Sequence, residues 1–338
     1  MNFIDRVLKD HHEELELDSY GLGPGWDTVI LTPQFVTSRH VVGLIIAAND
    51  PRPRLVVKVP RQPGDNAGVR READMLRQLW ALSPDRTEGM PEIVGTFDVG
   101  NHCVLVETAM TGDQLDPALV AANFPGAMAS GLEFVTALPV TRGASSNSDW
   151  YERKVSEPLR ALSTLVADHA EVVALVERTH ELLAGLRTAE LPAVFEHGDL
   201  SHPNIFVQPG GKLQVVDWER SSSDGLPGHD LIFYLQYLHE SAKNAFSRPQ
   251  QMGAFDDAFA LGGRPRGPLR QHLEARGVDP ALLPLLIIAT WARSAATLGE
   301  RLAGECLPGE DQDRVRRTVF SDRDFWLWRH AVNTSGQG

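Results

Sequence analysis

The sequence predicts an α+β protein with a small β-rich N-terminal part that contains one helix, followed by a larger, mainly helical C-terminal part. Two observations support this prediction. Up to residue 107, short runs rich in Val, Ile and Leu follow one another, with one helical segment among them. After Gly112, apolar residues recur at the spacing of amphipathic helices. With 338 residues the chain can bury a core in each of two lobes, which we place at residues 1–112 and 113–338.

The N-terminal part is predicted to contain three strands, a helix and two more strands, in that order. The strands are residues 28–33, 40–48, 54–59, 92–99 and 102–107. The helix follows the third strand, because Val69, Ala73 and Leu76 recur every three to four residues. Asp65 or Asn66 is the candidate N-cap of this helix.

The C-terminal part carries helical patterns and no internal repeat. Apolar residues in 169–186 fall on one helical face. The most apolar segment, Ala281–Ala292, contains Pro284 and is followed directly by Arg293. This segment is too short to span a bilayer, so it predicts a buried helix. Residues 139–150 are polar and rich in Gly and Ser, which predicts a surface loop.

Composition and charge exclude several classes of protein. The formal net charge is −13, and nucleic acid needs a basic surface, so it is not an expected partner. An acidic surface suits cationic partners, although it also serves solubility alone. Cys103 and Cys306 lie far apart, which argues against a disulfide framework or a cysteine zinc site. The N-terminus has acids where a signal peptide has an apolar stretch, so we expect a cytoplasmic protein without a membrane partner.

The most informative stretch is HGDLSHPNIFVQPGGKLQVVDWER, which begins at His197. Two short apolar runs flank the glycine pair of QPGGK, and such a pair is a signal for a two-residue hairpin loop. A hairpin centred on that pair places Asn204 directly opposite Asp217, with both side chains on the same face. Asp199 then lies on the loop that enters the hairpin.

Three polar side chains of this stretch suit phosphoryl transfer. The amide oxygen of Asn204 and the carboxylate of Asp217 are the kind of oxygen ligand that binds Mg²⁺. Asp199 is then placed to take a proton from an attacking hydroxyl, or to orient it. A polar turn before a hairpin would also explain the pattern, but the predicted pairing of Asn204 with Asp217 favours a metal site.

HGDLSHPN, followed thirteen residues after Asn204 by DWE, resembles the catalytic loop and metal motif of aminoglycoside phosphotransferase-like kinases. These small-molecule kinases share the protein-kinase fold, so the resemblance implies a two-lobed protein-kinase-like architecture. Residues 1–112 would then form the nucleotide-binding lobe, and residues 113–338 the catalytic and substrate-binding lobe. The resemblance also implies Mg²⁺ and ATP as the co-substrate, with GTP as an alternative.

The resemblance implies further nucleotide-binding residues. Lys58, a lone charge in LVVKV, would bind the α- and β-phosphates, and Glu72 on the next helix would pair with it. CVLVETAMTG resembles the segment that contacts adenine, here through the carbonyl of Glu107 and the amide of Ala109. Ser38 lies between the first two strands, where the family has its phosphate loop, although this loop has no glycine.

Other features match small-molecule kinases and depart from protein kinases. Asp230, in GLPGHDL, resembles the aspartate that braces the catalytic loop. The metal motif reads Asp-Trp-Glu, and the stretch from Arg220 to Asp230 is too short for a long activation loop. Ser201 stands where protein kinases place a catalytic lysine. These departures favour a small-molecule substrate.

The sequence therefore predicts an ATP- and Mg²⁺-dependent O-phosphotransferase that moves the γ-phosphate to a hydroxyl of a small, polar acceptor. Aminoglycosides and other cationic antibiotics fit the family and the negative charge, which would make this a resistance enzyme. Sugars and amino alcohols remain open as acceptors. The alternative from another class is a non-catalytic, nucleotide-binding pseudokinase, and the intact Lys58, Asp199 and Asp217 argue against it.

Overall fold

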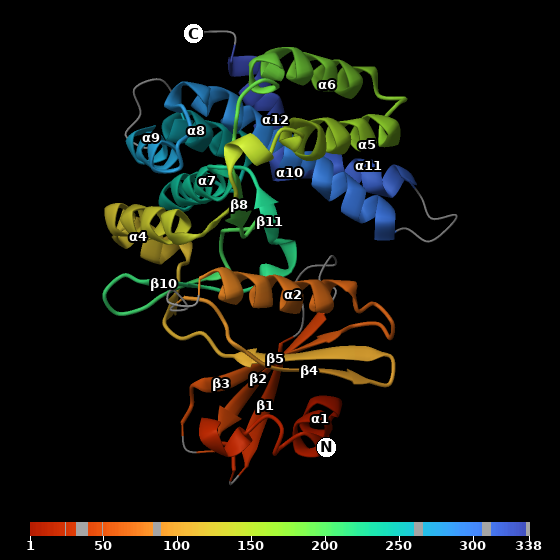
Figure 1. The fold of residues 1–338 in the computed structure, drawn as a ribbon, viewed down its shortest axis with the longest axis vertical. Coiled ribbons are helices and arrows are strands. Elements are labelled where there is room, and N and C mark those ends of the chain that lie inside the picture. The colour runs from red at the N-terminus through yellow and green to blue at the C-terminus, as the bar shows by residue number, and fades with distance from the viewer. Residues whose placement is uncertain are drawn as a thin grey trace. The chain divides into compact units, whose positions relative to one another are not determined.

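In the computed structural model of the chain, the described residues are 1–23, 25–31, 40–48, 50–83, 89–259, 266–305 and 312–335. They form two compact units (Figure 1). The first unit combines Met1–Leu115 with Pro203–Ser222, and the second combines Asp116–His202 with Ser223–Gly338. The hairpin of the DWE motif thus groups with the N-terminal residues. The functional division of the chain at residue 112 stays a prediction.

A five-stranded antiparallel sheet forms the centre of the first unit, with strand order β1-β2-β3-β5-β4. Its strands are β1 (Trp26–Leu31), β2 (His40–Ala47), β3 (Pro53–Pro60), β4 (Ile93–Val99) and β5 (His102–Thr108). All five strands were predicted from their β-branched and apolar runs, with ends that differ by a few residues.

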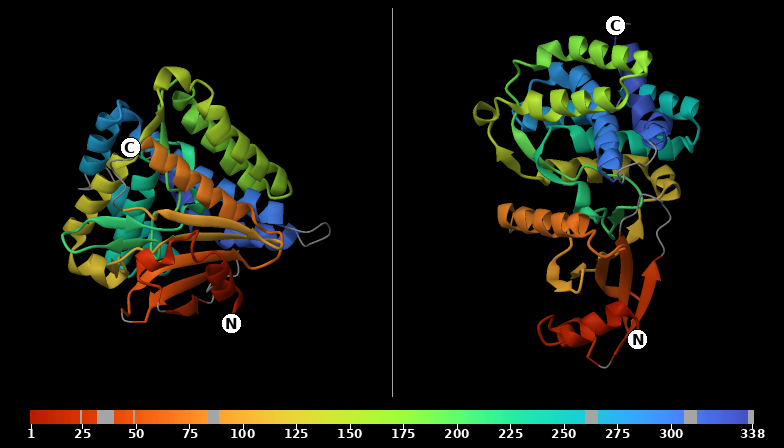
Figure 2. Two further views of the ribbon diagram at one scale, coloured as in Figure 1. Left: turned by 60° about the horizontal axis from the view of Figure 1, so that its bottom comes forward. Right: turned by 90° about the vertical axis from the view of Figure 1, so that its right-hand side faces the viewer.

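Helices cover both faces of this sheet (Figure 2). Helix α1 (Phe3–Asp10), which the sequence did not predict, packs against strand residues such as Val57 on one face. Helix α2 (Ala67–Leu82) packs against Leu105 on the other face. Because side chains alternate along a strand, Lys58 points to the α2 side while Val57 points to the α1 side.

A smaller sheet in the first unit contains the predicted hairpin. Its order is β10-β9-β6, with β6 at Asp113–Gln114, β9 at Ile205–Val207 and β10 at Leu213–Val215. A short 3₁₀ turn, Trp218–Arg220, follows β10 and contains most of the DWE motif. The prediction of a hairpin here is confirmed.

The predicted register of this hairpin is wrong by one residue. Leu213 pairs with Val207, and the Val216 N–H donates to the Asn204 carbonyl at 2.9 Å. Asn204 is therefore opposite Val216 and not opposite Asp217. The loop has three residues, Pro209, Gly210 and Gly211, because the Gly211 N–H donates to the Gln208 carbonyl at 2.9 Å. Pro followed by a glycine with φ of 96° is a type II turn, and this turn shifts the pairing.

The second unit is mainly helical and contains one small sheet, β11-β8-β7. Its strands are β7 (Val140–Arg142), β8 (Ala193–Glu196) and β11 (Ser222–Gly225). Its described helices are α3 (Pro117–Ala122), α4 (Phe124–Ala137), α5 (Glu157–Leu165), α6 (Ala170–Leu182), α7 (His229–Lys243), α8 (Arg248–Phe259), α9 (Arg266–Ala275), α10 (Leu283–Glu305), α11 (Gln312–Ser321) and α12 (Arg323–Thr334). The surface-loop prediction for residues 139–150 is wrong in part, because β7 pairs with β8 and Trp150 is buried.

Helix α10 contains the most apolar segment of the chain and packs against α5, α7, α11 and α12. The predicted buried helix is confirmed, although it runs longer than the apolar segment. Among the described residues, one helical stretch, Pro280–Leu302, is long and apolar enough to cross a membrane. In the most apolar part of this stretch, 18 residues long, 61% is buried inside the protein. A buried core helix of a soluble protein can have the same length and apolar composition, so these two properties alone are weak evidence for a membrane span.

Candidate active site

A buried cluster of charged side chains lies between β3, β5 and α2 in the first unit. The Lys58 ammonium lies 2.5 Å from the Glu72 carboxylate and 3.1 Å from that of Glu107. All three residues are buried, with Glu72 and Glu107 each 1% exposed. The predicted proximity of Lys58 and Glu72 is therefore present, and Glu107 adds a second carboxylate.

The ionisation of this cluster follows from burial and from its charges. Burial lowers the pKa of Lys58, but the carboxylates of Glu107, Glu72 and Asp217 outweigh it, so this pKa is raised above its ordinary value. Burial raises the pKa of Glu107 to about 7, against the opposing charge of Lys58. Lys58 is therefore cationic at neutral pH, while Glu107 gains and loses its proton near that pH.

Glu72 links Lys58 to the DWE motif. Its carboxylate accepts the backbone N–H of Trp218 at 2.9 Å, in addition to the bond from Lys58. The indole of Trp218 is fully buried and donates to the Val215 carbonyl. The motif is thereby held against α2 by a backbone bond and by an apolar side chain.

Asp217 has a backbone conformation that is uncommon for a residue other than glycine, with φ of 68° and ψ of 64°. Such conformations cost free energy and persist where the surrounding structure requires them, often in functional sites. Among the residues that the structure describes, Oδ1 of Asp217 is buried and has no hydrogen-bond partner. A buried carboxylate oxygen of this kind is suited to a cation.

His40 and Glu219 lie beside Asp217, and the sequence did not lead us to expect either of them at the metal site. One ligand atom of each of these three residues lies within 4.8 Å of the others, a spacing that could hold a metal ion. The His40 imidazole lies 3.6 Å from the Glu219 carboxylate. Burial, and then the charge of Lys58, lower the pKa of His40. Burial, and then the charges of Asp217 and Glu72, raise the pKa of Glu219 to about 7.

Two residues expected to contact the nucleotide base, Glu107 and Ala109, already have partners within the first unit. The Ala109 N–H donates to the Arg54 carbonyl at 3.0 Å, next to the β3–β5 pairing. Its role as an adenine donor stays a prediction, and would require that bond to give way. The side chain of Glu107 faces Lys58, while its carbonyl role is untested. Ser38 lies outside the described residues.

In the second unit, the loop that follows β8 carries His197, Gly198 and Asp199. The carboxylate of Asp230, at the start of α7, accepts the N–H of His197 at 2.7 Å and that of Gly198 at 2.9 Å. The Asp199 N–H donates to Nδ1 of His197 at 3.2 Å. Asp230 therefore braces the loop, as the sequence predicted, and His197 is fully buried within it.

The structure thus groups some of the predicted site residues. Lys58, Glu72 and Glu107 meet directly in the first unit, and the charge of Asp217 acts on them. Asn204 belongs to the same unit and is buried. Asp199 belongs to the second unit, where Asp230 holds its loop. Glu219 follows Asp217 in the DWE motif, and that spacing was the sequence signal for a further acid at this site.

Comparison with known proteins gives one family. The model of the phosphotransferase enzyme family matches residues 45–272, which is more than half of the chain. No curated protein matches the sequence.

Several solved structures are similar to this chain at low sequence identity. An ethanolamine kinase from Plasmodium vivax is 12% identical with a TM-score of 0.53, over 95% of this chain and 82% of that chain. An aminoglycoside phosphotransferase from Streptomyces rimosus is 17% identical with a TM-score of 0.46, over 82% of this chain and 100% of that chain. At these identities the likeness concerns the fold alone. The likeness to the ethanolamine kinase, with its TM-score of 0.53, confirms the predicted two-lobed, protein-kinase-like α+β fold.

Proposed function

Because the chain belongs to the phosphotransferase enzyme family, we propose that it is a small-molecule kinase that transfers the γ-phosphate of ATP to a hydroxyl group. The observation that carries this proposal is the buried Lys58–Glu72 pair, whose glutamate also binds the backbone of the DWE motif. Phosphoryl transfer requires a cation for the phosphates and metal ligands that are held rigidly beside it. GTP remains the alternative donor.

The cluster of the first unit supports Mg²⁺ binding. Asp217 and Asn204 are the proposed ligands, and the buried, unpartnered oxygen of Asp217 fits a cation. Two neighbouring acids, Glu72 and Glu219, add negative charge near Asp217. The single positive charge of Lys58 does not balance these carboxylates, which favours the binding of a cation. When bound, Mg²⁺ supplies charge neutralisation between the β- and γ-phosphates. Lys58 contributes a fixed ammonium for the α- and β-phosphates, and Glu72 sets its position.

Asp199 is the proposed catalytic residue. Its carboxylate accepts the hydroxyl proton of the acceptor as the acceptor oxygen forms its bond to the γ-phosphorus. The bond between that phosphorus and the bridging oxygen of the β-phosphate breaks at the same time, so ADP leaves. Ser38, the Glu107 carbonyl and the Ala109 amide are the proposed contacts to the nucleotide.

The proposed acceptor is a small, polar hydroxyl compound, and a cationic one fits the net charge of −13. An aminoglycoside or another cationic antibiotic is one such compound, and antibiotic resistance would be the corresponding role. A sugar or an amino alcohol of metabolism is the second candidate. The reaction is proposed to take place in the cytoplasm.

A panel assay tests this proposal. ADP release with Mg·ATP is measured against aminoglycosides, peptide and nucleoside antibiotics, sugars and amino alcohols. Wild type should release ADP with one acceptor class, and Asp217→Ala should lower the turnover at least ~100-fold, because it removes a metal ligand. Asp313→Ala, an exposed change on α11, is the control and should keep full activity. Full activity in Asp217→Ala would refute the assignment. Nucleotide binding without transfer to any acceptor would favour the pseudokinase.

A further inference from the structure

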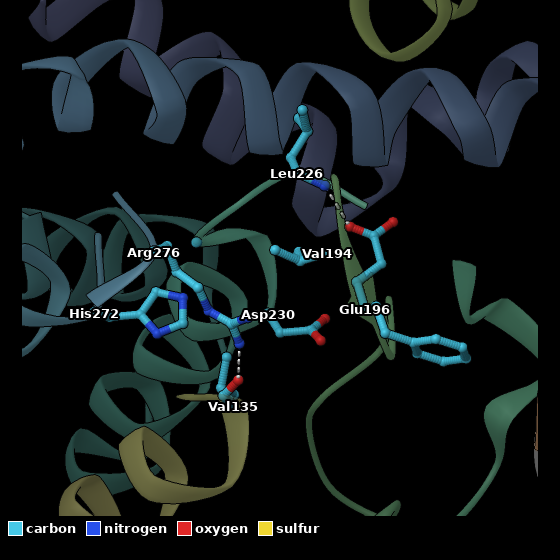
Figure 3. Close-up of a pocket in the computed structure, with 9 residues that line it drawn as sticks. Val135, Val194, Glu196, Leu226, Asp230, His272 and Arg276 are labelled. Carbon is cyan, nitrogen blue, oxygen red and sulfur yellow. Dashed lines mark hydrogen bonds between the residues drawn. The ribbon is translucent and has the colours of Figure 1, made fainter. Parts of the chain in front are cut away.

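The residue that precedes the HGD loop is a buried glutamate with its own partners. Glu196 is the last residue of β8 and is 4% exposed. Its carboxylate accepts from the Arg293 guanidinium at 2.8 Å and from the Leu226 N–H at 3.1 Å; Figure 3 shows the second bond. A Cβ at Gly225 would lie 2.6 Å from the Glu196 side chain, so the glycine of β11 leaves room for it. At the end of β8 this carboxylate therefore has two hydrogen-bond donors and the space that Gly225 leaves.

Arg293 comes from a distant part of the sequence and is buried beside Glu196. It lies on α10, is 8% exposed, and follows the buried residues Trp291 and Ala292. It also lies beyond residues 45–272, which match the family model. Burial raises the pKa of Glu196, but the charge of Arg293 outweighs it and holds this pKa at about 2. The pair is therefore ionic at neutral pH.

The loop after Glu196 is held from the other side by a second buried carboxylate. Asp230 binds the N–H groups of His197 and Gly198, and burial, followed by the charge of Glu196, raises its pKa to about 6. Figure 3 shows Glu196 and Asp230 among the residues that line a cavity of about 10 Å³, which is about the size of one water. Two acids thus flank the start of the loop.

The neighbouring groups leave Arg293 as the main compensating charge. The pKa of His229 is lowered to about 3, by burial first and then by Arg293, so its imidazole is neutral. Lys154 acts on Glu196 more weakly than Arg293 does. Without Arg293, Glu196 would be a buried charge with poor compensation, which is costly and would strain the strand end.

We propose that Arg293 is a positioning residue for the Asp199 loop: its buried ion pair with Glu196 fixes the strand end from which this loop starts. The geometry that supports this is one continuous set of contacts from α10 through β8 to the loop that Asp230 braces. The proposal rests on the proposed function, because Asp199 is there the residue that orients the acceptor hydroxyl.

Hydrogen exchange and turnover of variants test this role. Arg293→Met removes the charge and keeps much of the length, while Arg293→Lys keeps the charge. The matched control is Arg178→Met, which breaks an exposed pair with Glu181 on α6. Amide exchange is measured by mass spectrometry across the whole chain, and turnover at saturating ATP with the acceptor found in the panel.

For Arg293→Met we expect amide exchange at least 10-fold faster in residues 196–199, with the segments of the first unit unchanged. Turnover should fall at least 10-fold while the KM for ATP stays within 2-fold. Arg293→Lys should recover a large part of both losses, and Arg178→Met should match wild type. If Arg293 only stabilised the fold, Arg293→Met would lower the melting temperature but would not lower turnover selectively while the KM for ATP stays unchanged.

Two results would overturn the proposal: wild-type exchange in residues 196–199 of folded Arg293→Met, or equal losses in Arg293→Lys and Arg293→Met. If Arg293→Met does not fold, Arg293→Lys decides. Its ammonium makes one point contact in place of the guanidinium fork, so exchange in residues 196–199 should stay about 2- to 3-fold faster than wild type, and exchange identical to wild type would then overturn the proposal. Exchange needs no acceptor and no turnover. Failure of wild type to phosphorylate any acceptor would therefore refute the proposed function, while the exchange data would still judge the positioning role.

Discussion

Lys58 is one positive charge among several buried carboxylates, and this imbalance determines much of the chemistry of the first unit. The resemblance to kinases predicted the strand lysine and its helix partner Glu72. The position of the Glu107 side chain could not be predicted, because the face on which a residue near a strand end lies depends on the register with its neighbours. The contact of its carboxylate with the Lys58 ammonium, at 3.1 Å, shows that this side chain lies on the Lys58 face. The register agrees, because Lys58 pairs with Leu105, two residues before Glu107 on β5.

Replacement of Glu107 by glutamine should make the protein more stable above pH 7. The folded-state pKa of Glu107, about 7, lies above the ordinary value of 4.5. The stability that this group contributes is therefore fully present below pH 4.5 and is lost as the pH rises through about 7. Glutamine carries no charge and avoids this loss, which is on the order of 1 to 3 kcal/mol.

Urea unfolding of wild type and Glu107→Gln at several pH values between 5 and 8 measures this effect. The advantage of the variant should be small at pH 5 and largest at pH 8. Glu177→Gln, an exposed change on α6, is the control and should shift stability little at any pH. A variant advantage that does not grow with pH would contradict the account of the buried cluster.

Among the elements, strands and helices were predicted better than the contacts that fix them. The glycine pair of QPGGK indicated the hairpin, but the preceding Pro209 makes a type II turn and a three-residue loop, which displaced the predicted register. Asn66 is the residue that precedes α2, as predicted, yet its side chain does not cap the helix. Its oxygen accepts the Cys103 N–H at 2.7 Å, so a contact between elements replaces the local one.

The packing of α4 against α7 depends on a glycine that sequence reasoning did not single out. A Cβ at Gly131 would overlap the ring of Tyr234, whose hydroxyl donates to the Ala127 carbonyl at 2.7 Å. Gly131→Ala should therefore lower the free energy of unfolding by about 1 to 3 kcal/mol, because the buried ring cannot move freely.

Thermal unfolding of Gly131→Ala and of a matched glycine checks this expectation. Gly253 lies inside helix α8, and a Cβ added to it would have no neighbouring atom within 4 Å. Gly253→Ala should stabilise the protein by about 0.5 to 1 kcal/mol, because alanine favours helix. Equal effects of the two substitutions would show that the close approach of α4 and α7 does not limit the size of this residue.

For the whole molecule, the order of elements and the spacing of motifs predicted the fold class. A β-rich part followed by a mainly helical part predicted the α+β architecture, and the resemblance of the HGD and DWE motifs predicted the family. Contacts between distant segments could not be predicted this way. Examples are the grouping of Pro203–Ser222 with the N-terminal residues and the pair between Glu196 and Arg293. Neither leaves a periodic or local signal in the sequence.

This chain is proposed to transfer a phosphoryl group to a small hydroxyl compound, with Asp199 as the catalytic residue. The most direct test follows the γ-phosphate of labelled ATP into the product, identified by mass spectrometry, for wild type and Asp199→Asn. We expect a phosphorylated acceptor with wild type and at least a ~100-fold lower rate with Asp199→Asn, at unchanged nucleotide binding. An equal rate of product formation in the variant would contradict the proposal.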